Sequence, residues 1–489
     1  MRLSFALYLV FQDSNHFPLG HGSGFDWPVV LRVKMNLTRM RRIGLVWLLL
    51  CCGVSVLWGV FLERASPNGL ADFKAIYYGA RCLILHSDPY KESEFLHVYQ
   101  AEGGGFPSDP ARLQIFRRAV PVCINLPTAL LVAAPFSILA WGSAHLLWMI
   151  LTAGVYLLAA CLMWKLARNY APGISLFLIC MVLANSEILF SGGNLAGIAV
   201  SLCVVAVWCF LEKQYLPAGI LCLAVSLAIK PHDAGLVWLY FLLAGGVYRK
   251  RALQTLVVTV VLALAAILWV TSIAPQWMGE LNSNLQATMA PGALNAPGPS
   301  SVSFRSSNML IDLQTVISVF RDDPRIYNPA SYLICGTLLL VWSIRTLRAR
   351  FSRPGAWIAL AAIAALSMLP VYHRQYDAKL LLLTVPACAM LWAEGGLTGW
   401  IALLVNSAGV VVTGDIPSAI LLNLTGNLRI PAAGLCGKIL TVVLLQPAPF
   451  ILLLMGIFYL WVYLRRDPAH VATAESGEPG ESPLAPTQA

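Results

Sequence analysis

The chain has 489 residues, of which 58% are hydrophobic and 11% are charged, and its mean hydropathy is +0.72. Because soluble domains carry about 25% charged residues, this composition excludes a water-soluble globular protein. The formal net charge of +10 would suit nucleic acid. The basic residues, however, lie in short clusters between apolar runs, as in the cytoplasmic loops of membrane proteins, so no nucleic-acid partner is expected.

Residues 1–42 are expected to form a cytoplasmic N-terminal segment, because three arginines precede the first apolar run at about 43–62. Such positive charge holds the start of a span in the cytoplasm. The stretch "MNLTRMRR" from Met35 is a natural beginning for a membrane protein. A translation start at Met35 is therefore favoured, which would leave residues 1–34 without a function.

Repeated apolar runs approach the ~20 residues that cross a bilayer. They predict an all-α, polytopic membrane protein in which residues 43–464 form one domain with about twelve transmembrane helices. After the first, the expected spans are roughly 143–164, 173–190, 195–211, 216–229, 233–248, 252–273, 330–344, 354–370, 378–393, 397–413 and 448–464.

One apolar stretch, residues 121–140, is not counted as a span. Counting it would place Lys165 and the Arg249–Arg251 cluster outside, whereas omitting it places both inside. Its three prolines also argue against a simple crossing. The stretch is interpreted as a helix that dips into the outer leaflet, within a long first outer loop, 63–142, that contains membrane-surface helices.

On this topology both termini are cytoplasmic, in the inner (cell) membrane. Residues 465–489 form a disordered cytoplasmic tail, because a Pro/Ser/Glu-rich segment cannot bury a core. Three large segments, 63–142, 274–329 and 414–447, lie outside. Function is expected at the outer face, where the elaborate loops are.

Ionisable groups at the boundary of a span are candidates for function. Asp72 opens "LADFKAIYYGAR", although an acid there would also stabilise a helix N-terminus. The segment "VYHRQYDAKLL", residues 371–381, gathers charge at the start of a span, where tyrosine and lysine also serve as interfacial anchors. Its candidates are His373, Arg374, Tyr376, Asp377 and Lys379.

Two breaks between apolar runs add further candidates. Lys230 begins a charged "KPHD" break that would also suit an ordinary tight turn. Asn194 lies in "SGGNLAG", a glycine-lined turn that lets the backbone approach a ligand or another segment closely. Both signals are shared with ordinary turns between spans.

Common catalytic motifs are missing from the sequence. There is no Walker A, G-x-G-x-x-G, H-E-x-x-H or G-x-S-x-G pattern, so ATP-driven and common hydrolase functions lack support. The twelve cysteines form no C-x-x-C pair and mostly lie in apolar runs, as small packed hydrophobes do. No paired metal-ligand set is visible, so no metal ligand is assigned, and metal dependence is left open.

The order of these motifs resembles a known family. "D-F-x-x-x-Y-x-x-A-R" is followed by "D-P-Y", an Asn/Pro apolar helix, a Gly/Asn turn, a Lys-Pro and "H-x-x-Y-D". Over about residues 43–464 this is similar to glycosyltransferase family 87 (domain of unknown function 2029). These are polyprenyl-phosphate-sugar-dependent GT-C membrane glycosyltransferases related to mycobacterial mannosyltransferases. The chain departs from the family pattern at Gly193, usually a glutamine, and at the start of the apolar helix, which usually opens with a Pro-Pro pair and here reads Asn125-Leu126-Pro127.

The resemblance implies that Asp72 lies beside the acceptor hydroxyl, with Asp72 and His373 as the catalytic candidates. A base must take the hydroxyl proton in an inverting transfer, and cations should surround the phosphate leaving group. The candidates for substrate binding are Tyr78, Arg81, Asp88, Tyr90, Asn125, Asn194, Lys230, Arg374, Tyr376, Asp377 and Lys379.

The expected function is transfer of a hexose, with mannose as the leading candidate, from a polyprenyl-phosphate donor. The acceptor is a hydroxyl of a lipid-linked or cell-envelope glycan on the outer face, and no cofactor beyond this co-substrate is expected. The partners are thus the donor, the glycan acceptor and membrane lipids. The alternative is a transporter or flippase of lipid-linked sugars, although no clear internal repeat supports it. A non-catalytic scaffold is disfavoured by the polar cluster at residues 371–381.

Overall fold

The protein is described by a computed structural model over residues 37–66, 69–301, 304, 310–426 and 434–466. Within these residues every regular element is a helix, apart from an isolated bridge between Leu310 and Arg374. The all-α prediction is therefore confirmed. The favoured start at Met35 and nearly all of the expected tail lie outside the described residues.

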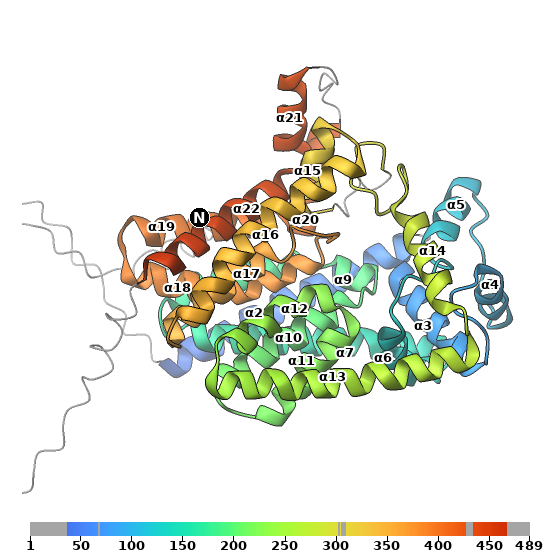
Figure 1. The fold of residues 1–489 in the computed structure, drawn as a ribbon, viewed down its shortest axis with the longest axis horizontal. Helices are drawn as coiled ribbons and strands as arrows, with labels where there is room; N and C mark the ends of the chain where they lie inside the picture. Colours follow the sequence, from blue (N-terminus) through green and yellow to red (C-terminus); the bar gives the residue numbers. More distant parts are fainter. Residues whose placement is uncertain (1–36, 67–68, 302–303, 305–309, 427–433, 467–489) are drawn as a thin grey trace, which may run out of the picture.

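The helices follow one another with short connections (Figure 1). The first part of the chain forms α2 (Leu37–Ala65), α3 (Ala71–Ile84), α4 (Glu92–Ala101), α5 (Pro110–Ala119), α6 (Pro127–Ser137), α7 (Trp141–Ala167), α8 (Pro172–Ala184), α9 (Ile188–Ser191), α10 (Ala196–Leu211), α11 (Leu216–Ile229), α12 (Pro231–Leu243) and α13 (Gly246–Ile273). The second part forms α14 (Trp277–Met289), α15 (Leu313–Phe320), α16 (Pro324–Arg348), α17 (Arg353–Leu366), the 3-10 helix η2 (Asp377–Thr384), α18 (Val385–Glu394), α19 (Gly396–Val412), α20 (Asp415–Gly426), α21 (Leu435–Leu445) and α22 (Pro447–Arg465).

Six described segments are long and apolar enough to cross a membrane, or seven if α19 and α20, which meet at 71°, form one bent span. The six are Arg41–Ala65, Trp141–Ala167, Pro172–Ser191, Gly246–Ile273, Pro324–Arg348 and Pro447–Arg465. Other expected spans coincide with shorter apolar helices such as α10, α11 and α17. At 1.5 Å per residue these reach roughly 20–24 Å, short of a ~30 Å hydrocarbon core. Twelve spans therefore stay a prediction.

The apolar helices divide into an enclosed core and an outer layer. All but one residue of α10 are buried, and the alanine-rich α17 is buried from Ala356 to Leu366, since small side chains let neighbouring helices approach closely. By contrast, α13 exposes apolar side chains, with Leu268 70% and Val257 64% exposed. Such a surface is stable only against lipid, so α13 lies at the periphery of an integral membrane protein.

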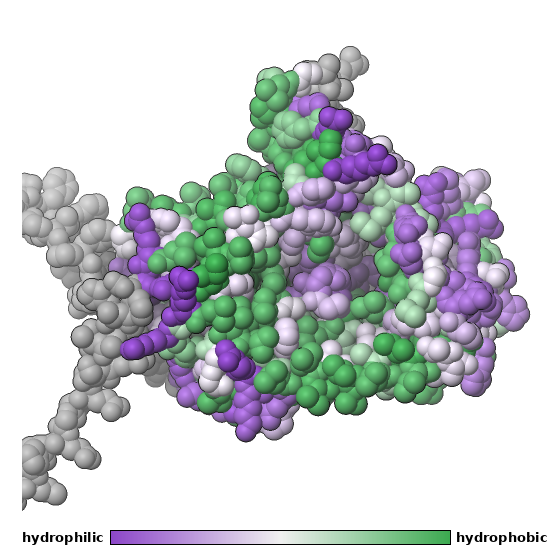
Figure 2. Space-filling model, in the orientation of Figure 1, coloured by the Kyte–Doolittle hydropathy of each residue, from purple (hydrophilic) through white to green (hydrophobic). Residues whose placement is uncertain are grey.

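The segment expected to dip into the outer leaflet forms α6, which has only 11 residues. A helix of that length spans about 16 Å and cannot cross the bilayer alone. In Figure 1, α6 lies against α3, which belongs to the same end of the molecule as α4, α5 and α14. Figure 2 shows hydrophilic side chains over α4, α5 and α14 at that end, and a largely hydrophobic surface over α13.

The basic segments gather away from this end. Arg353 at the start of α17 pairs with Glu212 at the end of α10, at 3.4 Å. Arg345 near the end of α16 donates to the carbonyl of Arg466 after α22, at 2.5 Å. The ring of Tyr248 at the start of α13 stacks on Phe351. The clusters that the topology assigns to the cytoplasm are thus neighbours in space.

We predict that this basic end faces the cytoplasm. Reporter domains fused after Arg251 or Arg350 should be active in the cytoplasm, and reporters fused within residues 280–300 should be active outside, because positive residues are retained on the inner side. The inverted pattern would show that residues 121–140 do cross and would reverse every later assignment.

Candidate functional site

The N-terminus of α3 is docked onto the turn that follows α9. The backbone N–H groups of Leu70 and Asp72 donate to the carbonyls of Ser191 and Gly192, at 2.8 and 3.2 Å. Phe73 N–H also donates to the Gly192 carbonyl, at 3.3 Å. The first N–H groups of a helix have no partners within the helix, so the turn satisfies them and fixes where α3 begins.

Gly193 and Asn194 give this turn its shape. Gly193 has φ +65°, and a Cβ there would lie 2.6 Å from the Cβ of Phe73, so only glycine fits. Asn194 donates from Nδ2 to Asp72 Oδ2 at 2.8 Å and accepts from Ala196 N–H through Oδ1 at 2.8 Å. The second bond fixes the amide so that its NH₂ group faces Asp72.

Asp72 is half-buried in the first turn of α3. Burial raises the pKa of its carboxyl above the ordinary value, although the Asn194 hydrogen bond and the positive charges of Arg374 and Lys230 partly oppose the rise. A carboxyl with a raised pKa is a stronger base once it is ionised. The arrangement therefore suits acceptance of a proton.

Lys230 lies between α11 and α12, with only 12% of its side chain exposed. Its ammonium donates to Asp377 Oδ1, lies 3.5 Å from Asp233 Oδ2 and sits 4.9 Å from the centre of the Tyr376 ring. A buried ammonium needs such partners to offset its desolvation. The loop "KPHD" and the segment 371–377 are thereby joined, although 147 residues separate Lys230 from Asp377.

Arg374 is buried in the neighbouring loop. Its guanidinium donates to Tyr372 Oη at 2.6 Å and to the Leu294 carbonyl and Asn295 Oδ1 at 2.9 Å. Its backbone pairs with Leu310 in the isolated bridge. Segments after α14 and before α15 thus hold the arginine in place.

His373 is fully enclosed behind this loop. Its Nδ1 lies 2.8 Å from the Val371 carbonyl, and its Nε2 lies 3.3 Å from Asp233 Oδ1. Burial lowers the pKa of His373, but the Asp233 interaction and the charge of Asp377 outweigh burial, so the net shift is upward. The ring of His232 lies edge-on, with its centre 4.9 Å from that of His373.

Asp72, Lys230 and Arg374 border a cavity of about 480 Å³, here named the central cavity. It has contributions from α3, the turn after α9, the start of α12, α14 and the 371–377 loop. Six of the predicted site residues line it: Asp72, Asn125, Asn194, Lys230, Arg374 and Tyr376. It is about the size of known small-ligand sites, which measure roughly 300–1,000 Å³.

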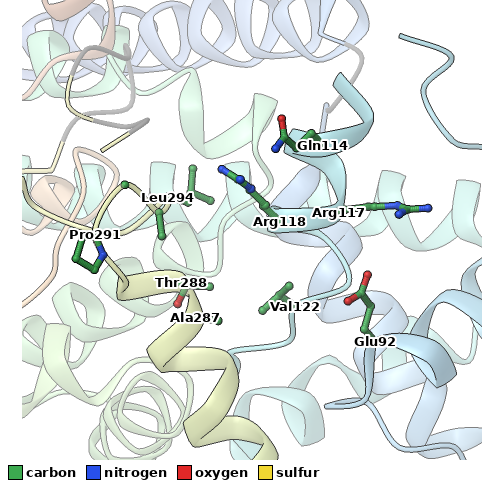
Figure 3. A pocket seen from close by; sticks show the side chains of 11 residues that line it. Glu92, Gln114, Arg117, Arg118, Val122, Ala287, Thr288, Pro291 and Leu294 are labelled. Carbon is green, nitrogen blue, oxygen red and sulfur yellow. The ribbon is translucent and has the colours of Figure 1, made fainter. Parts of the chain in front are cut away.

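A second cavity of about 480 Å³, here named the outer cavity, adjoins it, and the two share Arg118, Val122, Thr288 and Leu294. Figure 3 shows the outer cavity between α5 and α14, with Arg118 reaching toward Leu294 while Arg117 points the opposite way. Arg118 is therefore the α5 arginine that reaches both cavities.

Seven predicted site residues do not line the central cavity. His373 and Asp377 lie directly behind its wall, while Lys379 lies deeper, where it donates to the Asn185 carbonyl at 2.6 Å and faces Asp415 at 3.6 Å. The remaining four belong to the first outer loop and are Tyr78, Arg81, Asp88 and Tyr90.

Those four residues hold the loop together. The Tyr78 ring stacks on Trp141, and Arg81 pairs with Glu102 at 2.7 Å. Asp88 caps its own turn by accepting from Tyr90 N–H at 2.9 Å, and Tyr90 Oη donates to the Asn125 carbonyl at 3.0 Å. None of the four lines the central cavity, and the substrate binding that the resemblance implies for them stays a prediction.

Sequence reasoning missed several residues that line the cavity. Arg118 belongs to a basic helix in the first outer loop, and Asn295 to the Pro/Gly-rich loop after α14. His232 also lines the cavity, although the sequence pattern indicated it only as part of the "KPHD" break. The basic face of residues 110–119 was an available signal for Arg118. Nothing local marked Asn295, because its role depends on contact with Arg374, 79 residues away.

The fold and the site together define an integral membrane protein with an acid and two cations around one cavity at one end of its helices. The chain belongs to glycosyltransferase family 87, whose family model matches residues 124–370, just over half of the chain. It is therefore a membrane glycosyltransferase. The match covers Asn125, Asn194 and Lys230, but begins after Asp72 and ends before His373. No curated protein and no solved structure gave a significant match.

The Gly193 turn yields a prediction. Gly193→Ala should lower both the melting temperature and sugar transfer, because a left-handed alanine costs roughly 1–2 kcal/mol and its methyl would displace Phe73 and α3. Gly103→Ala is the matched control, since Gly103 has φ +83° with no atom within 4 Å of the added Cβ. Thermal unfolding and transfer rates of both variants measure the difference. Equal effects would show that close packing at Gly193 is unimportant.

Proposed function

We propose that this glycosyltransferase moves a hexose, with mannose as the leading candidate, from a polyprenyl phosphate to a hydroxyl of a lipid-linked or cell-envelope glycan. The observation that carries the proposal is that Asp72 shares one cavity with Lys230 and Arg374. A base and two cations around one space suit an attacking hydroxyl and an anionic leaving group. The site faces the outer side on the topology given above.

The chemistry assigns one task to Asp72. Its carboxylate takes the proton of the acceptor hydroxyl while that oxygen attacks the anomeric carbon. The bond from that carbon to the phosphate oxygen breaks, and the phosphate leaves with the electron pair, so the anomeric configuration inverts. Because Asn194 holds Oδ2, Oδ1 is the oxygen directed to the acceptor.

Lys230 and Arg374 supply the positive field for the departing phosphate. Both are held by several partners, so little reorganisation is needed when negative charge develops. Arg118 adds a more exposed cation at the junction of the two cavities. We assign the outer cavity to the glycan acceptor, because it leads from the polar loops toward the shared wall.

His373 acts from behind the wall in this proposal. It contacts Asp233, which in turn faces Lys230 at 3.5 Å, so His373 positions the cation and does not touch the acceptor. Tyr376 and Asn125 line the cavity and are assigned to the sugar. Membership of a glycosyltransferase family favours transfer over the transporter or flippase alternative.

The proposal predicts that purified protein consumes one member of a panel of polyprenyl-phosphate hexoses when membrane glycolipid extract is supplied. Asp72→Asn keeps the shape of the side chain and removes its basicity, so turnover should fall by about 10²-fold or more. Donor binding should persist, because a base acts mainly in the transition state. Product formation by mass spectrometry and donor binding by calorimetry measure the two effects.

The matched control is Asp322→Asn, an exposed loop acid that faces Ser300, which should leave turnover unchanged. Near-normal turnover in Asp72→Asn would remove Asp72 from the mechanism. Movement of lipid-linked sugar across a vesicle membrane without new glycosidic product would favour the flippase.

The raised pKa of Asp72 predicts a pH dependence. Because the base must be ionised, kcat/KM should fall as pH decreases through that pKa, at a higher pH than an unperturbed aspartate near 3.9 would give. The Asn194 hydrogen bond lowers the pKa. Asn194→Ala should therefore move the acidic limb to higher pH. A limb that stays in place would show that another group limits the rate.

A further inference from the structure

We infer that His232, Asp233 and His373 form a binding site for one divalent transition-metal ion. Their ligand atoms, two imidazole nitrogens and a carboxylate oxygen, all lie within 4.8 Å of one another. Two histidines and one carboxylate are a ligand set that suits Zn²⁺, with an open position left for another ligand.

The hydrogen-bond geometry requires a positive species among these atoms. The Val371 carbonyl can only accept, so Nδ1 of His373 carries a proton, and in the neutral ring Nε2 presents its lone pair to Asp233 Oδ1 at 3.3 Å. A lone pair facing a carboxylate at that distance is repulsive. Either a proton or a metal ion must lie between them.

Unsatisfied atoms mark the same place. Nε2 of His232, Nε2 of His373 and both carboxylate oxygens of Asp233 are enclosed yet have no geometrically acceptable hydrogen-bond partner. Asp233 Oδ2 faces Lys230 at 3.5 Å, whereas Asp233 Oδ1 and the two histidine nitrogens form one cluster. Because buried polar atoms are normally paired, three unsatisfied atoms in one cluster indicate a missing ligand. A shared proton would satisfy one contact of His373 but would leave His232 Nε2 unpaired.

The distances and charges also fit an ion. Ligand atoms about 2.1 Å from a tetrahedral ion lie roughly 3.4 Å apart. The His373 Nε2–Asp233 Oδ1 separation is 3.3 Å and the His232 Nε2–Asp233 Oδ1 separation is 3.8 Å, so only His232 must move inward. The Lys230 ammonium contacts two carboxylates, those of Asp233 and Asp377. The three groups together carry a net charge of about −1, which a bound cation would offset.

The location gives the ion a role. His232 lines the central cavity with 35% of its side chain exposed, whereas His373 and Asp233 close the site from behind. An ion held there would have its open position toward the cavity and would add to Lys230 at the donor phosphate. This role, unlike the binding itself, rests on the proposed function.

The test uses full-length protein in detergent, stripped with EDTA and reloaded with Co²⁺, which reports nitrogen and oxygen ligation by its visible absorption. We expect about one ion per chain by elemental analysis. His232→Gln should weaken Co²⁺ binding by at least roughly tenfold, and Asp233→Asn should abolish it.

The matched control is His145→Gln, because His145 also faces a carboxylate, Glu63, at 3.3 Å but has no third metal-ligating residue beside it among the residues that the structure describes. It should bind Co²⁺ as the unchanged protein does. Gel filtration and thermal unfolding identify any variant that fails to fold. Because His232 is partly exposed and Asp233 is buried, His232→Gln should disturb the fold less than Asp233→Asn. Failure to retain an ion in the unchanged protein, or equal binding by His232→Gln, would overturn the site in favour of a shared proton.

The phosphate role is tested separately, without any sugar transfer. Adding a short-chain polyprenyl phosphate to the Co²⁺-loaded protein should shift the visible absorption, and Asp72→Asn should show the same shift. A bound ion whose spectrum does not respond would keep the metal site and reject its contact with the donor. A protein that transfers no sugar, but whose Co²⁺ absorption shifts when polyprenyl phosphate is added, would contradict the proposed transfer and leave the contact between the ion and the donor intact.

Discussion

The hydrogen bond from Asn194 to Asp72 joins two parts of the candidate site. The geometry of the rest of the site depends on this contact. It links the turn after α9 to the first residues of α3, and the backbone bonds from Leu70, Asp72 and Phe73 to that turn reinforce it. This contact fixes the acidic end of α3 against the turn that leads into α10, while α6 packs against α11, whose C-terminal end leads into Lys230. The contact between the turn and α3 requires a glycine with positive φ at position 193, because any side chain there would push α3 away.

The charged groups form two layers around the central cavity. Asp72, Lys230 and Arg374 line it, whereas Asp233, Asp377 and His373 lie behind and hold the first layer in place. Buried charges are stable only when paired and hydrogen-bonded, so the second layer is a physical requirement of the first. The same arrangement keeps the cations preorganised for the phosphate of the proposed donor, and it leaves the His232–Asp233–His373 cluster next to the cavity.

The segment between α2 and α7 supports the central cavity through contacts among its own residues. Tyr78, Arg81, Asp88 and Tyr90 are occupied with neighbours inside this half of the molecule, and Tyr90 also supports Asn125, which does line the cavity. Within the stretch "DFKAIYYGAR", Asp72 and Ala75 reach the cavity, and Asp72 is the charged residue among the two.

The sequence by itself determined the all-α membrane class, most of the long apolar helices and the identity of Asp72, Asn194, Lys230 and Arg374 as candidates. These follow from local properties, namely the length of apolar runs and the rarity of charge at their ends. Only the tertiary structure decided which candidates meet at one cavity, because Lys230–Asp377, Arg374–Asn295 and His373–Asp233 are contacts between segments 79 to 147 residues apart. No periodicity or motif reports such distances. The packing of the helices does, since it brings the end of α11, the start of α12 and the 371–377 loop to the same end of the bundle.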